Sequence, residues 1–130
     1  MASLDRNKKQ FGFKRIISSI KNSWNGLKVA YKNEQSMYIH LICTIILLLF
    51  SLFLKISTTE WLIIIAIIGL TLVIELLNTA IESTVDLVTK EFHPLAKIAK
   101  DTASAAEFIL TLTSAIISLM IFIPKIMELL

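Results

Sequence analysis

Four polar side chains recur at helical spacing beside the most apolar part of this 130-residue sequence: Glu75, Asn78, Glu82 and Asp86. On an α-helix, where each residue advances by about 100°, these side chains fall within about 80° of one another and extend along roughly 16 Å. Three carboxylates on one face repel each other unless cations lie nearby. Because hard oxygen ligands suit Mg²⁺ held together with substrate phosphates, the pattern predicts a magnesium- and phosphate-binding face.

A second polar stripe follows later in the chain, and its members also share one helix face. It comprises Lys100, Ser104, Glu107, Thr111, Ser114 and Ser118. Serine and threonine in apolar helices commonly serve helix packing, which is the simplest interpretation of the last three. Lys100 and Asp101 lie at the entrance to an apolar segment, so Lys100 is predicted to contact phosphate. Snorkelling of its side chain to the interface is the alternative.

Glu34 is a further candidate ligand, because it lies where a basic segment must turn into an apolar one. We interpret it as a second metal ligand at the level of Glu82. A helix-start residue favoured by the helix dipole is the alternative. His40 and Thr44 are expected to line helix contacts, and Cys43 is expected to be buried apolar filler.

Three apolar runs would position these side chains. They cover residues 38–54, 61–78 and 103–123, and each approaches the roughly 17–25 residues that cross a bilayer. The composition, 55% hydrophobic and 18% charged, excludes a disordered chain, and a single cysteine excludes a disulfide scaffold. We therefore predict an all-α integral membrane protein that forms one domain over residues 1–130.

The segment before the first run is basic and amphipathic. Residues 1–37 carry eight lysines and arginines, including Arg6, Lys8 and Lys9. Apolar side chains recur at helical spacing over residues 11–32, which predicts a surface helix facing anionic head groups. The positive-inside rule places the N-terminus in the cytoplasm and the C-terminus outside a plasma membrane. We expect no cleaved signal peptide, because the first span serves for insertion.

Several common motifs do not occur in the sequence. There is no GxxxxGK[ST] loop, GxGxxG turn, HExxH pair or CxxC pair, and glycine occurs three times. Metal and side chains must therefore hold any phosphate donor. Nucleic acid is not expected as a partner, because the basic face is interfacial and carries few aromatic side chains.

Two stretches resemble a known family. They are ELLNTAIESTVD at 75–86 and HPLAKIAKD at 93–101, preceded by the Glu60-Trp61 start of the second span. Over about residues 11–124 the chain resembles the prokaryotic diacylglycerol kinases, small integral-membrane lipid kinases, and most closely their Gram-positive undecaprenol kinase branch. The resemblance implies a homotrimer that uses ATP and Mg²⁺ to phosphorylate a lipid alcohol at the cytoplasmic interface, in active sites shared between subunits.

The resemblance also implies roles for individual residues. Glu75 would be the general base toward the lipid hydroxyl, and Glu34 and Glu82 would bind Mg²⁺. Arg15 would reach the nucleotide or the lipid head, and Ser104 would lie near the lipid. The residues implied to bind ATP are Arg15, Glu34, Asn78, Glu82, Asp86, Glu91, His93, Lys100 and Asp101.

Three functions stay open at this point. The first is phosphorylation of undecaprenol, which recycles a lipid carrier for cell-wall synthesis. The second is phosphorylation of diacylglycerol, and the third is a non-catalytic membrane subunit that binds cations or a partner. Four positions depart from the family pattern, of which Lys90 and Phe92 vary the loop around Glu91 and His93. Tyr38 replaces a basic or amide side chain, and Glu107 replaces a small apolar one.

Overall fold

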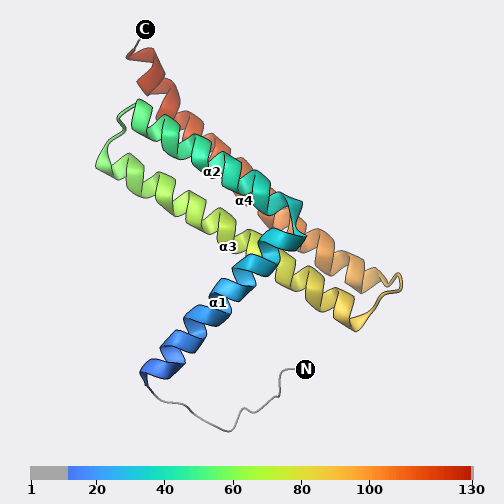
Figure 1. The fold of residues 1–130 in the computed structure, drawn as a ribbon. Coiled ribbons are helices and arrows are strands. Elements are labelled where there is room, and N and C mark those ends of the chain that lie inside the picture. Colours follow the sequence, from blue (N-terminus) through green and yellow to red (C-terminus); the bar gives the residue numbers. More distant parts are fainter. Residues whose placement is uncertain (1–11, 130) are drawn as a thin grey trace.

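Residues 12–129 are described by the computed structural model, and they form four helices without a strand among them. The helices are α1 (Phe13–Asn33), α2 (Gln35–Phe53), α3 (Thr58–Val88) and α4 (Pro94–Met127). The three apolar helices α2, α3 and α4 lie alongside one another, and α1 leaves them at a steep angle (Figure 1). Arg6, Lys8 and Lys9 of the expected basic arm lie outside the described residues.

The helices α2, α3 and α4 are each long and apolar enough to cross a membrane, as the sequence predicted. Their bounds differ from the apolar runs, because α3 has 31 residues and α4 has 34. No glycine or proline interrupts residues 75–88, so the helical pattern continues beyond the apolar part. At about 1.5 Å per residue, α3 exceeds a hydrocarbon core of about 30 Å, and its polar last turns extend past it.

The turn between α2 and α3 is tight because both helix ends are satisfied locally. The backbone N–H of Ile56 donates to the carbonyl of Ser51 at 3.3 Å, and that of Lys55 donates to Leu52 at 3.2 Å. With Lys55 in the left-handed region at φ 48°, this is a Schellman motif. Ser57 and Glu60 then form a capping box at the start of α3. The two helices are therefore antiparallel, with a short connection between them.

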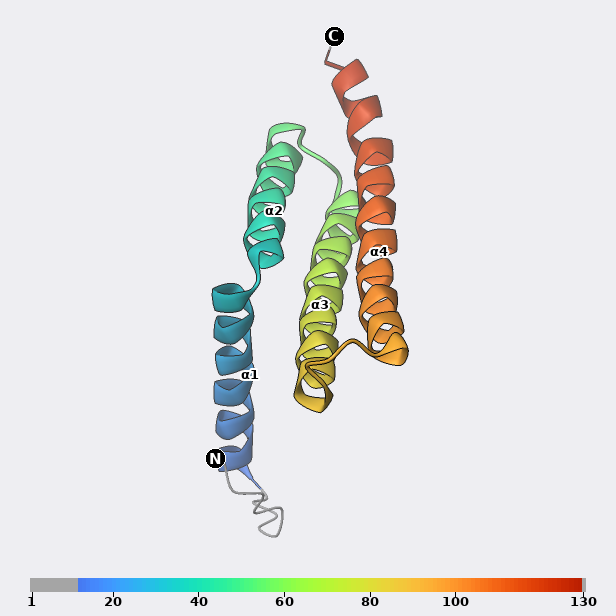
Figure 2. The same ribbon diagram turned by 90° about the vertical axis from the view of Figure 1, so that its right-hand side faces the viewer.

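The turn between α3 and α4 lies at the opposite end of the molecule from the C-terminus (Figure 2). His93 caps α4 by accepting the N–H of Leu95 at its Nδ1, at 3.2 Å, and Pro94 occupies the first helical position. This arrangement suits proline, whose missing N–H is not needed there. Both features fix where the polar first turns of α4 meet the polar last turns of α3.

The third apolar run was expected to end at residue 123, just before Pro124, but α4 continues through this proline to Met127. Proline removes one backbone hydrogen bond and crowds the preceding turn, which is tolerated most easily close to a helix end. The helix α4 therefore ends four residues beyond the apolar run.

The buried apolar core lies near the α2–α3 turn, away from the polar ends of α3 and α4. It consists of Leu54, Ile56, Ile64, Ile67, Ile121 and Phe122. Most other large apolar side chains of α2, α3 and α4 are exposed, which suits helices surrounded by lipid or by further copies of the chain. Cys43 is exposed as well, so its expected burial was wrong for the single chain.

The helix α1 begins the described part of the chain and buries Ala30 alone among its 21 residues. Ile16, Ile17 and Trp24 of its apolar stripe are exposed. Glu34, in extended conformation at φ −111° and ψ 119°, is the single residue between α1 and α2. The change of direction between the two helices therefore occurs at Glu34.

Candidate active site

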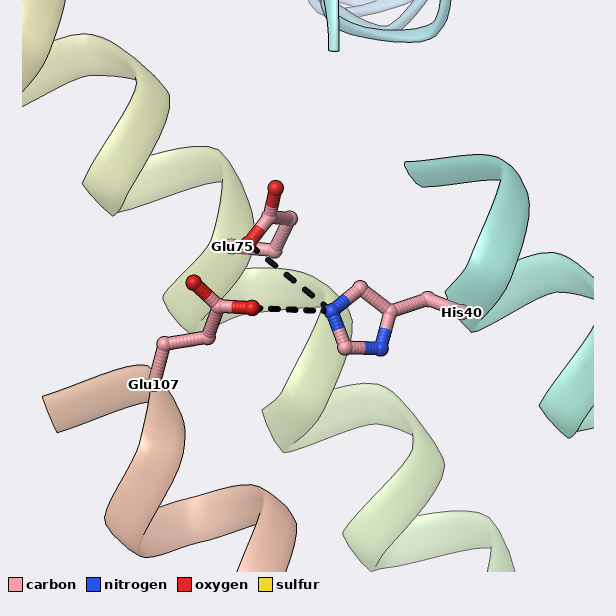
Figure 3. Close-up of side chains that lie close together, drawn as sticks. All are labelled: His40, Glu75 and Glu107. Carbon is pink, nitrogen blue, oxygen red and sulfur yellow. Dashed lines mark hydrogen bonds and ion pairs between the residues drawn. The ribbon is translucent and has the colours of Figure 1, made fainter. Parts of the chain in front are cut away.

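Glu75 is the most deeply buried acidic side chain among the described residues, with 1% of its surface exposed. It projects from α3 toward α2, where Ser36 Oγ donates a hydrogen bond to its Oε1. Its other oxygen, Oε2, lies 3.8 Å from His40 Nε2 and has no hydrogen-bond partner (Figure 3). A carboxylate this deeply buried needs compensation by a proton, a cation or further donors.

Glu107 of α4 completes a cluster around Glu75. Its Oε1 lies 3.2 Å from His40 Nε2, and its Oε2 accepts a hydrogen bond from Asn78 Nδ2 at 3.4 Å. The amide oxygen of Asn78 is buried without a partner. Within residues 12–129, His40, Glu75 and Glu107 are the one group of three or more such ligands whose atoms all lie within 4.8 Å of one another.

Local helix geometry explains how the cluster forms. The break at Glu34 starts α2 at Gln35, which places Ser36 and His40 four residues apart on one face. Glu75 and Asn78 are three residues apart on α3, so they also share a face. Because α3 packs mainly against α4, Glu107 of α4 reaches Asn78, and its other oxygen reaches His40 of α2.

A second group of predicted residues meets where the C-terminal turns of α3 lie beside the N-terminal turns of α4. Lys100 Nζ donates to Asp86 Oδ1 at 2.6 Å, so the lysine does meet the carboxylate face of α3. The side chains of Lys100 and Asp86 lose little hydration in this pair, because they are 35% and 55% exposed. The pair lines a hollow of about 380 Å³ together with Glu91, His93 and Asp101. Five of the residues predicted to bind ATP therefore surround one space.

The loop between α3 and α4 orders part of that hollow. The backbone N–H of Glu91 donates to Thr89 Oγ1 at 3.1 Å, and Thr89 Oγ1 lies 3.3 Å from the carbonyl of Glu91. On the first turns of α4, Lys97 Nζ lies 2.5 Å from Asp101 Oδ2 in an exposed pair one helical turn apart. Lys97 therefore adds a second cation to the lining, beside Lys100.

Other predicted site residues are not joined by contacts within the single chain. Glu34 and Glu82 are half-buried, and the described residues show no hydrogen bond or ion pair between them. Arg15 is exposed on α1. Ser104 is exposed on α4 and lines a hollow with Ser36, His40 and Glu107, so it lies on the open side of the Glu75 cluster.

Sequence reasoning missed three members of the cluster or gave them another role. Ser36 was not considered, His40 was expected to line a helix contact, and Glu107 had no assigned partner. The placement of Glu107 on the polar stripe of the third apolar run was a usable signal. Ser36 and His40 gave a weaker signal, because they are four residues apart and closely follow Glu34.

A membrane-level hollow of about 330 Å³ lies between α2, α3 and α4, on the side of the cluster toward the core. His40 and Thr71 both line this hollow, and Thr71 lies one helical turn before Glu75 on α3. Most of its other lining side chains are apolar. Glu75 itself does not line the hollow, but His40, whose Nε2 lies 3.8 Å from Glu75 Oε2, does. A space that suits a hydrocarbon chain therefore lies next to the cluster.

Comparison with known proteins agrees with this geometry. A family model described as prokaryotic diacylglycerol kinase matches residues 21–122. Undecaprenol kinase of Bacillus subtilis (strain 168) is 40% identical over 111 residues, which are 85% of this chain and 90% of that protein. Diacylglycerol kinase of Pseudomonas aeruginosa is 40% identical over 78% of this chain and 83% of its own length. Diacylglycerol kinase of Escherichia coli (strain K12) is 32% identical over 81% of this chain and 86% of its own length.

The family match covers α2, α3 and most of α4, together with the residues of both polar groups described above, whereas Arg15 lies outside it. The alternative of a non-catalytic subunit is not retained, because the similar proteins are kinases. The chain belongs to the prokaryotic diacylglycerol kinase family and is an integral membrane lipid kinase.

Proposed function

We propose that this kinase transfers the γ-phosphate of ATP to undecaprenol at the cytoplasmic membrane interface and so supplies undecaprenyl phosphate. The observation that carries the proposal is the buried carboxylate of Glu75, which lies between apolar helices and 3.8 Å from His40, a residue that lines the mostly apolar hollow between α2, α3 and α4. A lipid alcohol has its tail in hydrocarbon and its hydroxyl at the head-group level, which is the geometry that such a carboxylate suits.

In the proposed reaction the lipid hydroxyl oxygen forms a bond to the γ-phosphorus while the bond to the bridging β–γ oxygen breaks. Glu75 takes the hydroxyl proton, and ADP leaves. Ser36 orients the Glu75 carboxylate through its hydrogen bond. Phosphoryl transfer depends mostly on positioning and on neutralising charge, so the protein needs few reactive groups.

The hollow at the α3–α4 end is the proposed ATP site. Lys100 would leave Asp86 to contact phosphate oxygens, and Asp101, beside it on α4, faces the same space. Glu91 and His93 would hold the nucleoside. Asn78 would complete the site between this hollow and Glu75, and Arg15 would approach the nucleotide or the lipid head from α1.

Glu34 and Glu82 are the proposed Mg²⁺ ligands, and their donor chemistry fits, since each supplies carboxylate oxygens. Magnesium in nucleotide enzymes is usually held by one or two carboxylates and the substrate phosphates, so two residues suffice. The ion would neutralise charge on the phosphates when ATP is bound. Ser104, on the open side of the Glu75 cluster, would lie near the lipid head.

We further propose a homotrimer in the plasma membrane, with active sites shared between subunits, the N-terminus in the cytoplasm and the C-terminus outside. The exposed apolar faces of α2, α3 and α4 support an assembly. The exposed apolar residues of α1, flanked by lysines, support a helix on the membrane surface.

Undecaprenol is proposed as the acceptor because the similarity to the Bacillus subtilis undecaprenol kinase extends over 85% of this chain. Diacylglycerol is the second candidate, because the Pseudomonas aeruginosa diacylglycerol kinase is equally identical over 78% of the chain. Both acceptors carry a single hydroxyl on a lipid, so the same residues would serve either one.

The test is a radiolabelled-ATP assay on the full chain in detergent micelles with Mg²⁺, offering undecaprenol and diacylglycerol in parallel. We expect undecaprenol to be phosphorylated with the higher kcat/KM. A preference for diacylglycerol would overturn the choice of acceptor, and phosphorylation of neither lipid would overturn the proposed reaction. Omission of Mg²⁺, with chelator added, is expected to abolish transfer.

A further inference from the structure

The cluster of His40, Glu75 and Glu107 has more acceptors than donors. Two carboxylates and an imidazole converge, yet Glu75 Oε2 and Asn78 Oδ1 are both buried without a hydrogen-bond partner. Ser36 satisfies one oxygen of Glu75, and Asn78 Nδ2 satisfies one oxygen of Glu107. His40 Nε2 lies 3.2 Å from the other oxygen of Glu107, so within this cluster Glu75 Oε2 is the carboxylate oxygen left without a hydrogen-bond partner.

The donor set and its dimensions suit a small divalent ion. Zn²⁺ binds imidazole nitrogen and carboxylate oxygen at about 2.0–2.2 Å, so neighbouring ligands in a tetrahedron lie about 3.4 Å apart. His40 Nε2 is 3.2 Å from Glu107 Oε1 and 3.8 Å from Glu75 Oε2. A small movement of Glu75 brings all three atoms to such spacings, and water would fill the fourth position.

We infer that His40, Glu75 and Glu107 form a binding site for Zn²⁺ or a similar transition-metal ion, separate from the Mg²⁺ ligands Glu34 and Glu82. Imidazole favours such ions over magnesium, which prefers oxygen ligands. Asn78 supports the site by holding Glu107.

An entry path exists on the open side of the cluster. The side chains of His40 and Glu107 are 12% and 22% exposed, whereas that of Glu75 is 1% exposed. Both partly exposed ligands line the hollow that also contains Ser36 and Ser104. An ion can therefore bind His40 and Glu107 from the hollow and then draw in the oxygen of Glu75.

Occupancy of this site has a consequence that rests on the proposed function. If Glu75 is the base for the lipid hydroxyl, a metal bound to its oxygen removes the acceptor for the hydroxyl proton. The ion then inhibits transfer without competing with ATP. Binding itself depends only on the cluster and stands whether or not Glu75 is the base.

The binding test uses Co²⁺ as a spectroscopic probe on the purified full chain in micelles, without ATP. We expect visible ligand-field bands that Zn²⁺ displaces, and their loss in His40→Gln and in Glu107→Gln. Removing even an outer partner of a metal site costs about 10–100-fold in affinity, so loss of a ligand should cost at least as much.

Two control variants test whether Co²⁺ binds instead to the Cys43 thiol or to the proposed Mg²⁺ ligand Glu82. Cys43 lies one helical turn from His40 on the same side of α2 and lines the same membrane-level hollow, so Cys43→Ala tests for thiol binding. Glu82→Gln removes a proposed Mg²⁺ ligand. Both variants are expected to keep the Co²⁺ bands. Bands that survive in both His40→Gln and Glu107→Gln, or no bands in the unaltered chain, would overturn the inference.

The inhibition test measures transfer at saturating Mg²⁺ and ATP while Zn²⁺ is added, with each variant scaled to its own metal-free rate. We expect the Zn²⁺ concentration for half-inhibition to rise by about tenfold or more in His40→Gln and to be unchanged in Cys43→Ala. Binding without inhibition would reject Glu75 as the base and leave the metal site standing. Inhibition that is equal in all variants would reject the metal site as its cause.

Discussion

At the scale of single residues, the important contrast is between Glu75 and the other acids of α3. Glu75 is buried against Ser36 and His40, whereas Asp86 is exposed and paired with Lys100. Two carboxylates on one helix face therefore have different surroundings, which suits different tasks. Under the proposed function, the buried carboxylate would accept a proton from the lipid hydroxyl, and the exposed one would meet charged groups from water.

Glu75→Gln tests the proton-accepting role. Glutamine keeps the shape and an acceptor oxygen for Ser36, so the fold and the ATP site should persist. We expect kcat to fall by about 10²–10⁴-fold, the usual contribution of a general base, with the KM for ATP nearly unchanged. Glu60→Gln, at the other end of α3, is the control and should retain normal kcat. Near-normal turnover in Glu75→Gln would rule out this role.

At the scale of elements, the start of α4 positions one wall of the proposed ATP hollow. His93 serves as its N-cap and also lines the hollow, so one side chain has a structural contact and a proposed nucleotide contact. The capping contact uses Nδ1, which leaves the rest of the ring facing the hollow. These two roles respond differently to substitution.

The variants His93→Ala and His93→Asn distinguish the capping role of His93 from its proposed nucleotide contact. Loss of an N-cap costs about 1 kcal/mol, while asparagine is a strong N-cap. We expect His93→Ala to lower the free energy of unfolding in detergent by this amount and His93→Asn to preserve it. Both variants should raise the KM for ATP, because both lack the imidazole. A normal KM in the stable asparagine variant would limit His93 to capping.

The elements could largely be predicted from sequence, and the reasons are local. The helical spacing of Glu75, Asn78, Glu82 and Asp86 needed only an unbroken helix, and α3 runs through all four. The helix bounds were predicted less well. An apolar run marks where hydrocarbon begins and ends, whereas a helix ends at its caps, such as Thr89 and His93. The apolar runs therefore understated α3 and α4.

At the scale of the whole molecule, a single chain leaves much apolar surface uncovered, and its proposed Mg²⁺ ligands are not joined. Glu34 is the N-cap residue of α2, and Glu82 lies in the C-terminal part of α3. The proposed homotrimer, with sites completed by a neighbouring subunit, would account for both features. Such assembly is a property that sequence spacing does not reveal.

Mixing inactive subunits tests the sharing of sites. We expect Glu75→Gln and Glu82→Gln chains, each inactive alone, to regain part of the activity after they are co-assembled from denatured mixtures. The gain arises because some sites then draw an intact Glu75 and an intact Glu82 from different subunits. Activity is measured against each variant reassembled by itself. No recovery, with mixed assemblies confirmed by tagged chains, would place both residues of each site on one subunit.

The long-range partners were the part of the site that sequence could not supply. Glu107 lies 29 residues after Asn78 and 67 after His40, and contacts both. Periodicity places each of them on a face of its own helix, but it does not determine how far neighbouring helices slide or rotate against each other. Packing of α2 and α4 against α3 determines that, and so decides which polar groups meet.

The break at Glu34 gives the chain a pivot. With 21 residues at about 1.5 Å each, α1 is a rigid arm of about 31 Å whose orientation depends on the two backbone torsions of one residue. Rotation about a pivot moves the far end of an arm most and the pivot itself least. The last turn of α1 stays against α2, where Tyr31 contacts Tyr38 and Ala30 is buried. If α1 lies on the membrane surface as proposed, a small change in the Glu34 torsions would therefore move its first turns far more than the Glu34 carboxylate.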